Sequence, residues 1–124
     1  VDENRTVTIL MGENNKLKIF RGLMAAPKLT PRSVEYGKDG LRKVLLEQKQ
    51  AVLEYTGTKD KGMIVIIKPT KKSKYRNLVD VLDEMAIVGV PTYAIVNEFT
   101  PEESKLIGGG AAAAAPATEE TTNP

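Results

Sequence analysis

Two short segments near the start of the chain alternate apolar and polar residues with the period of a β-strand. Residues 6–11 read TVTILM and residues 16–20 read KLKIF, and the GENN stretch at residues 12–15 between them consists of turn-forming residues. This pattern predicts a β-hairpin. The side chains expected to face inward are those of Val7, Ile9, Leu17 and Ile19.

Apolar residues then recur at helical spacing over about residues 40–55. Asp39 stands immediately before this segment and fits the N-cap position, and Thr56 and Gly57 are expected to end the helix. The predicted apolar stripe consists of Leu41, Val44, Leu45, Gln48, Ala51, Val52 and Tyr55.

A second helix is predicted over about residues 73–88. Gly89 fits the C′ position after it, and Pro91 cannot continue a helix. The predicted apolar stripe consists of Tyr75, Leu78, Val79, Leu82, Met85 and Ala86. The acidic residues expected on the opposite, solvated side are Asp80, Asp83 and Glu84.

Each of these helices is followed by a short apolar segment, residues 63–67 after the first and residues 92–96 after the second. Their length and β-branched residues predict strands. A capping box then predicts a short last helix that ends near residue 107. Its members are Thr100 as N-cap, Pro101 at N1 and Glu103 at N3.

The predicted fold is therefore α+β, a small mixed β-sheet in the order β-β-α-β-α-β with two helices packed on one face. The strand, helix and strand of residues 63–96 are expected to cross over right-handed, which makes the two strands parallel. Residues 63–67 are apolar on both faces, so the second face of the sheet needs a cover. The candidates are the connection at residues 21–38, which Pro27 and Pro31 keep from being one helix, and a second protein chain.

Composition and charge limit the chemistry that the chain can perform. The 124 residues include no cysteine and no histidine, which removes the cysteine nucleophile, thiolate metal sites, the usual general base and the commonest metal ligand. A non-catalytic protein without cofactor or metal is therefore predicted. Residues 1–107 are expected to form one domain, and residues 108–124 a flexible low-complexity tail. Because two of the 16 acidic residues lie in that tail, the domain has 18 basic and 14 acidic residues, a net charge of +4.

Five positive charges lie within nine residues between the third predicted strand and the second helix. They are Lys68, Lys71, Lys72, Lys74 and Arg76. The simplest interpretation is a solvated loop without a binding function. The functional one is an anion-binding surface, because cations oppose the macrodipole at a helix N-terminus and give no structural benefit there. The GKDG sequence at residues 37–40 matches the GxxG of KH domains, but no helix precedes it, and nucleic-acid binding is not favoured.

The sequence resembles the periplasmic C-terminal domain of the ExbD/TolR biopolymer transport family. The resemblance depends mainly on residues 75–96, YRNLVDVLDEMAIVGVPTYAIV, which are similar to that family's helix, glycine and strand near the end of the domain. The opening hairpin at residues 6–20 and the helix entry KDGLRKVLLEQ at residues 38–48 also fit. Together these pieces span most of residues 6–96.

The resemblance implies a role as the periplasmic part of a stator-like subunit. Members of the family are anchored in the inner membrane by an N-terminal helix whose aspartate takes part in proton flow. They work with ExbB- or TolQ-type channel subunits and transmit the energy of the proton gradient to TonB or TolA. This chain is then expected to be a periplasmic domain that forms a homodimer and contacts an ExbB-like subunit and a TonB-like protein. Whether it is of the ExbD or the TolR type stays open.

Two binding hypotheses follow for this chain. The first is strand addition, in which a partner segment pairs with the last strand if that strand is a sheet edge. Its expected contact residues are Tyr93, Ile95 and Asn97, with the loop at residues 68–76 as an electrostatic contact. The second is a binding module for an anionic polymer, either cell wall or nucleic acid, centred on that loop.

Overall fold

A computed structural model describes residues 3–23, 26–58 and 61–107 of the chain. The tail at residues 108–124, which the sequence predicts to be flexible, lies outside the described residues. The elements in chain order are η1 (Glu3–Arg5), β1 (Thr6–Met11), β2 (Leu17–Leu23), β3 (Ala26–Val34), α1 (Leu41–Thr56), β4 (Ile64–Pro69), α2 (Tyr75–Val88), β5 (Thr92–Ile95) and α3 (Pro101–Leu106).

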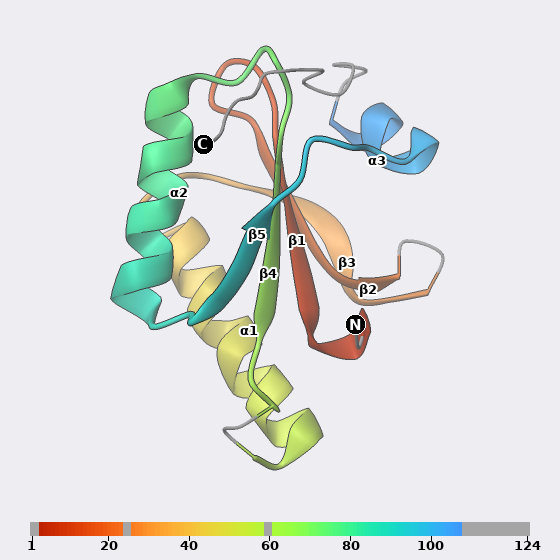
Figure 1. Ribbon diagram of the computed structural model, residues 1–124, viewed down its shortest axis with the longest axis vertical. Coiled ribbons are helices and arrows are strands. Elements are labelled where there is room, and N and C mark those ends of the chain that lie inside the picture. The colour runs from red at the N-terminus through yellow and green to blue at the C-terminus, as the bar shows by residue number, and fades with distance from the viewer. Residues whose placement is uncertain (1–2, 24–25, 59–60, 108–124) are drawn as a thin grey trace.

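The five strands form one mixed sheet in the order β3-β2-β1-β4-β5 (Figure 1). β1, β2 and β3 are antiparallel neighbours, whereas β4 is parallel to both β1 and β5. The predicted α+β class with a mixed sheet is confirmed, and so is the parallel pair formed by β4 and β5. In the predicted hairpin, Asn14 and Asn15 adopt φ values of 57° and 61°, a left-handed conformation that asparagine tolerates better than most residues.

The predicted order lacked one strand, β3, which lies in the connection at residues 21–38. This connection continues β2 to Leu23 and then contains β3, which pairs antiparallel with β2 at the edge of the sheet. An edge strand needs ladder hydrogen bonds on only one side, so it tolerates Pro27 and Pro31 better than a central strand does. The connection is therefore part of the sheet and does not cover its second face.

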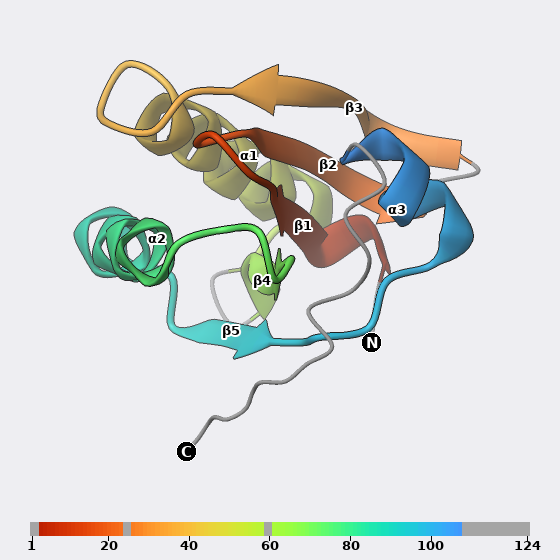
Figure 2. The same ribbon diagram turned by 90° about the horizontal axis from the view of Figure 1, so that it is seen from above.

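Both long helices pack on the same face of the sheet (Figure 2), as predicted. The strand side chains beneath them include the predicted Val7, Ile9, Leu17 and Ile19, all nearly inaccessible to solvent. From β4, Val65 and Ile67 join the same core. The alternation in the sequence was sufficient to place these residues, because neighbouring side chains of a strand point to opposite faces.

The start of α1 corrects the predicted N-cap. The N-cap is Gly40, not Asp39, and no side chain caps the helix. Backbone carbonyls of the preceding turn accept from the first amides instead, with Leu41 N bonded to Glu35 O at 2.7 Å. A Cβ at residue 40 would lie 2.1 Å from that same oxygen, so this close approach requires glycine. The helix ends at Gly57 as predicted.

The buried face of α2 also differs from the predicted stripe. Its buried residues are Asn77, Val81, Glu84, Met85 and Val88. Of the predicted stripe, only Met85 is fully buried, Leu78 and Leu82 are half-buried, and Tyr75, Val79 and Ala86 are exposed. The helix is thus rotated relative to its most apolar side.

Two polar contacts explain this rotation of α2. Asn77 Nδ2 donates to Asn15 Oδ1 in the turn between β1 and β2 at 3.0 Å. Glu84, which was expected in solvent, accepts from Arg42 of α1, with Arg42 Nε 2.7 Å from Glu84 Oε1. A buried polar group is stabilised only when it has such a partner, so these contacts determine which side of the helix faces the core.

The second face of the sheet is partly covered by α3. Ile107, just after this helix, is buried with Leu10 and Phe20 from the strands, and Phe99 and Leu106 pack against them. Figures 1 and 2 show α3 on the side of the sheet opposite α1 and α2. The predicted capping box of α3 is present, since Glu103 N donates to Thr100 Oγ1 at 3.1 Å and Thr100 N donates to Glu103 Oε1 at 3.0 Å.

We expect Gly89→Ala to lower the free energy of unfolding by about 1–2 kcal/mol, because Gly89 adopts a φ of 84° after α2. Gly89→Asn is the matched variant, because asparagine also adds a Cβ but tolerates the left-handed region. It should lower the free energy of unfolding less than Gly89→Ala does. Urea denaturation measures both values. Equal losses of stability would show that the cost comes from contact of the new Cβ with Lys49 Nζ, at 3.2 Å, and not from the left-handed backbone conformation.

Candidate protein-interaction site

The two edges of the sheet differ in how open they are. β3 carries Pro27 and Pro31, which have no N–H to offer to another strand, whereas β5 contains no proline. Proline is one of the devices that protect an edge from further pairing. Within the described ranges, no strand pairs with the outer side of β5. β5 is therefore an edge strand, which is the condition on which the strand-addition hypothesis depends.

The backbone of β5 shows which residues would pair with a new strand. Val96 N donates to Ile67 O of β4 at 2.8 Å, so the amide of Val96 points into the sheet. Along a strand, alternate residues direct their N–H and C=O groups to opposite sides. Tyr93 and Ile95 therefore direct these groups outward. Both belong to the set predicted from the sequence; Asn97, the third, is exposed and lies beyond the end of β5.

The side chains of β5 lie on a definite face of the sheet. Tyr93 is opposite Val65 and Ile95 is opposite Ile67 in the parallel register. Since Val65 and Ile67 belong to the core beneath the helices, Tyr93 and Ile95 are on that helix-covered face too. They nevertheless remain 47% and 46% exposed, because they lie at the rim of the sheet.

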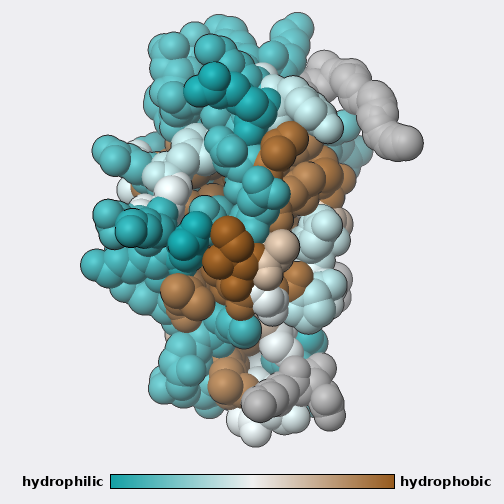
Figure 3. Space-filling view, turned by 90° about the vertical axis from the view of Figure 1, so that its left-hand side faces the viewer, coloured by the Kyte–Doolittle hydropathy of each residue, from teal (hydrophilic) through white to brown (hydrophobic). Residues whose placement is uncertain are grey.

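A line of apolar residues on α2, exposed except for the half-buried Leu82, runs along the same side of the molecule. Tyr75, Val79, Leu82 and Ala86 follow one line along the helix, about half a turn around from Glu84. Because Glu84 contacts α1, this line is on the side of α2 away from α1, and Figure 2 shows that β5 lies on that side. Apolar surface gathers across this side of the molecule (Figure 3). We call the outer side of β5 and this line of α2 the β5–α2 surface.

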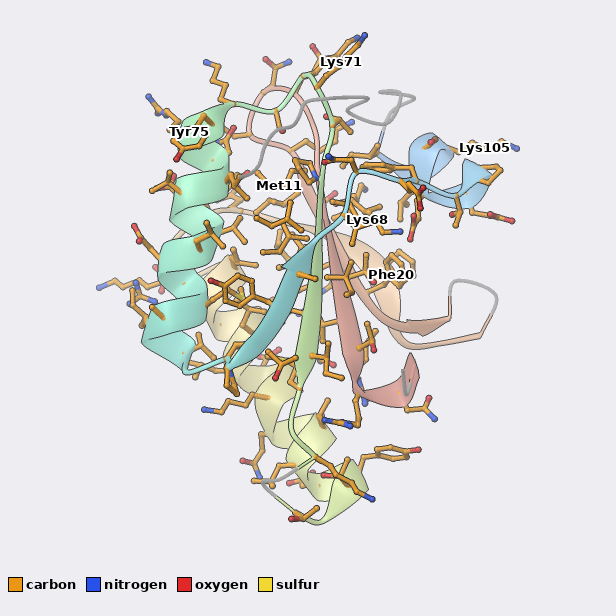
Figure 4. All side chains as sticks on the ribbon, in the orientation of Figure 1. Met11, Phe20, Lys68, Lys71, Tyr75 and Lys105 are labelled. Carbon is orange, nitrogen blue, oxygen red and sulfur yellow. The ribbon has the colours of Figure 1, made fainter. Side chains whose placement is uncertain are left out.

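The predicted basic cluster is divided by the structure. Lys68 Nζ contacts Glu103 Oε1 of α3 at 2.8 Å, with side-chain exposures of only 15% and 7%. This ion pair attaches α3 to the sheet, so Lys68 has a structural contact that the sequence did not indicate. Figure 4 shows Lys68 in the body of the molecule and Lys71 at its end.

The other four basic residues lie together on the β4–α2 loop and the first turn of α2. Lys71, Lys72, Lys74 and Arg76 are all exposed. Lys72 makes an exposed ion pair with Glu13, with Nζ and Oε1 3.7 Å apart, and such pairs contribute little to stability. No described residue forms an ion pair with the other three. The cluster is thus solvated and has three cations available to a partner.

The acidic residues of α2 are divided between a contact with α1, made by Glu84, and solvent, to which Asp80 and Asp83 are exposed. The hydrogen bond from Arg42 to Glu84 raises the pKa of the Arg42 guanidinium. Nearby, burial raises the pKa of Tyr36, with a smaller contribution from Asp80. Among the described residues, no group of His, Cys, Asp and Glu is arranged to hold a metal ion.

No family model, curated protein or solved structure matches the chain. The similarity to the ExbD/TolR family therefore stays a prediction from the sequence. Within the described ranges, none of the helices combines the length and the apolar character that a membrane crossing requires.

We expect Lys68→Met to lower the free energy of unfolding by about 1–3 kcal/mol, because it leaves the buried Glu103 carboxylate without its cation. Lys71→Met is the matched control, since Lys71 is exposed and unpaired among the described residues, and it should change stability by less than about 0.5 kcal/mol. Urea denaturation of both variants measures the difference. Equal stabilities would mean that the Lys68–Glu103 pair does not hold α3 in place.

Proposed function

We propose that this chain is an interaction domain that binds an extended segment of a partner protein by adding a strand to β5. One observation carries the proposal: among the described residues, β5 is an unpaired edge whose outward backbone groups come from Tyr93 and Ile95, and exposed apolar side chains of α2 lie on the same side of the molecule. In strand addition, main-chain hydrogen bonds supply affinity and contacts to alternate side chains supply specificity. The β5–α2 surface offers both.

The setting that we propose is the one implied by the ExbD/TolR resemblance. The domain would then be periplasmic and belong to a membrane-anchored, homodimeric subunit. It would couple an ExbB-like channel to a TonB-like partner for transport across the outer membrane. The sequence of residues 75–96 and the helix, glycine and strand that they form support this setting. The gene sequence upstream of Val1 tests it, because a single hydrophobic helix with one aspartate is expected there and a soluble domain would contradict it.

The second candidate function is binding of an anionic polymer, such as cell wall or nucleic acid, through the basic loop. The exposed and unpaired Lys71, Lys74 and Arg76 favour it, whereas the engagement of Lys68 with Glu103 removes one of the five predicted contacts. Salt distinguishes the two functions. Polyanion binding falls steeply as salt is raised, whereas backbone pairing at β5 survives moderate salt.

Strand addition predicts that Ile95→Pro abolishes binding of extended peptides, because proline removes an outward N–H of β5. The probes are peptides selected from a random ten-residue display library on the wild-type chain, and fluorescence anisotropy measures their affinity. Ile95→Thr keeps the N–H and the β-branched shape, so we expect it to bind within a few-fold of the wild type. Peptides that bind the proline variant as well as the wild type would overturn strand addition.

Stability measurements separate lost binding from lost folding. The N–H of Ile95 points away from β4, so Ile95→Pro should unfold within about 1 kcal/mol of the wild type. Ala94→Pro removes an N–H that points toward β4 and should destabilise the chain more. The reverse order would mean that the outward assignment of Tyr93 and Ile95 is wrong.

A further inference from the structure

Apart from Leu82, which packs against the core, the apolar line on α2 is exposed, although the helix buries polar groups elsewhere. Tyr75 is 80% exposed and Val79 is 37% exposed, while Asn77 and Glu84 are buried. A helix that only had to cover this sheet would be expected to bury its most apolar side. The exposed line is therefore available to a further element beside α2.

A strand added to β5 would lie where it contacts this line. It would continue the sheet by one strand spacing, and alternate side chains would point to the helix-covered face. On that face they would have Tyr93 and Ile95 on one side and the apolar line of α2 above them. On the opposite face, the neighbouring β5 residues are Thr92 and Ala94, which are exposed. An incoming segment with apolar residues at every second position fits this environment.

The basic cluster lies at one end of this position. α2 begins after β4 ends, and β5 runs parallel to β4, so β5 runs toward the end of the molecule that holds the β4–α2 loop and stops before reaching it. Figure 4 shows Lys71 and Tyr75 there. Lys71, Lys74 and Arg76 have no ion pair with any described residue, and they outnumber the exposed Glu98 that follows β5, so positive charge predominates at this end.

A second copy of this chain does not supply the missing negative charge. Two copies paired through β5 around a two-fold axis would be antiparallel, and each basic cluster would face the beginning of β5 in the other copy. Residues 86–92, which lead into β5, read AIVGVPT and contain no acidic residue. Charge complementarity thus favours a different protein over self-pairing.

We infer that the partner is an extended segment of another protein with apolar residues at alternate positions and acidic residues at the end that lies over the β4–α2 loop. This inference rests on the proposed strand addition and defines the chemistry of its ligand. The alternating residues would pack against α2, and the acidic end would neutralise Lys71, Lys74 and Arg76. Exposed ion pairs are individually weak. Pairing with β5 therefore supplies most of the affinity, and the acidic end determines which segments bind more tightly.

The test uses synthetic peptides of one alternating apolar and serine sequence that end in three glutamates, three glutamines or three lysines. Each tail is placed at either terminus, because the orientation of the added strand is a variable. At about 0.15 M salt the glutamate peptide in one of the two placements should bind about tenfold more tightly than its glutamine counterpart, which corresponds to about 1.4 kcal/mol. The lysine peptide should bind more weakly than either.

Two variants of the full chain identify the source of this preference. Lys71→Gln/Lys74→Gln/Arg76→Gln should remove the preference for glutamate and keep the affinity for the glutamine peptide. Ile95→Pro should abolish binding of all the peptides. Unfolding curves that superimpose on the wild type show that the triple variant keeps its fold.

The outcomes separate this inference from the proposed function. If glutamate and glutamine peptides bind equally and both depend on Ile95, strand addition stands and the acidic chemistry is wrong. If no peptide depends on Ile95, both are wrong. Binding of the glutamate peptide that survives Ile95→Pro but fails in the triple variant would indicate a polyanion site and overturn both. A dimer that Ile95→Pro dissociates, seen by sedimentation, would make a second copy the occupant and overturn the inference.

Discussion

The parallel pairing of β1 with β4 is the constraint from which the rest of the arrangement follows. Val7 lies opposite Val65 and Ile9 opposite Ile67 in this register, and all four side chains are buried under the helices. The pair joins the antiparallel β1–β2–β3 half to the parallel β4–β5 half. Because β1 and β4 occupy the middle of the sheet, later strands are added outward, and β5 becomes an edge. The function proposed for β5 is thus a consequence of strand order.

The orientation of α2 depends on polar contacts more than on its apolar side. Its N-terminal end is held to the β1–β2 turn through Asn77 and Asn15, and its middle to α1 through Glu84 and Arg42. Rotating the helix to bury Tyr75 and Val79 would break these contacts, and a buried carboxylate without its cation is strongly unfavourable. The apolar line beside β5 is therefore kept exposed by interactions on the opposite side of the helix.

Local patterns in the sequence were sufficient for the features that depend on neighbouring residues. They located the hairpin, the two long helices, the turn at Gly89 and the capping box of α3. They did not reveal β3, because prolines in an edge strand look the same in a sequence as prolines in a loop. The buried face of α2 and the role of Lys68 depend on Arg42, Asn15 and Glu103, residues far away in the chain. Of the proposed contact residues, Tyr93 and Ile95 followed from strand alternation, whereas Tyr75 and Val79 needed the rotation of α2.

An open apolar edge strand favours uncontrolled pairing with other chains, and two features of this chain oppose it. β5 has only four residues, and short edge strands are poor templates for uncontrolled pairing. The cations of the β4–α2 loop, toward which β5 runs, also repel other copies of a chain whose net charge is already positive. Neither feature prevents pairing with a segment of complementary charge. The same residues that restrain the pairing of two copies through β5 therefore favour a specific partner there, which is how repulsive and attractive elements combine in selective interfaces.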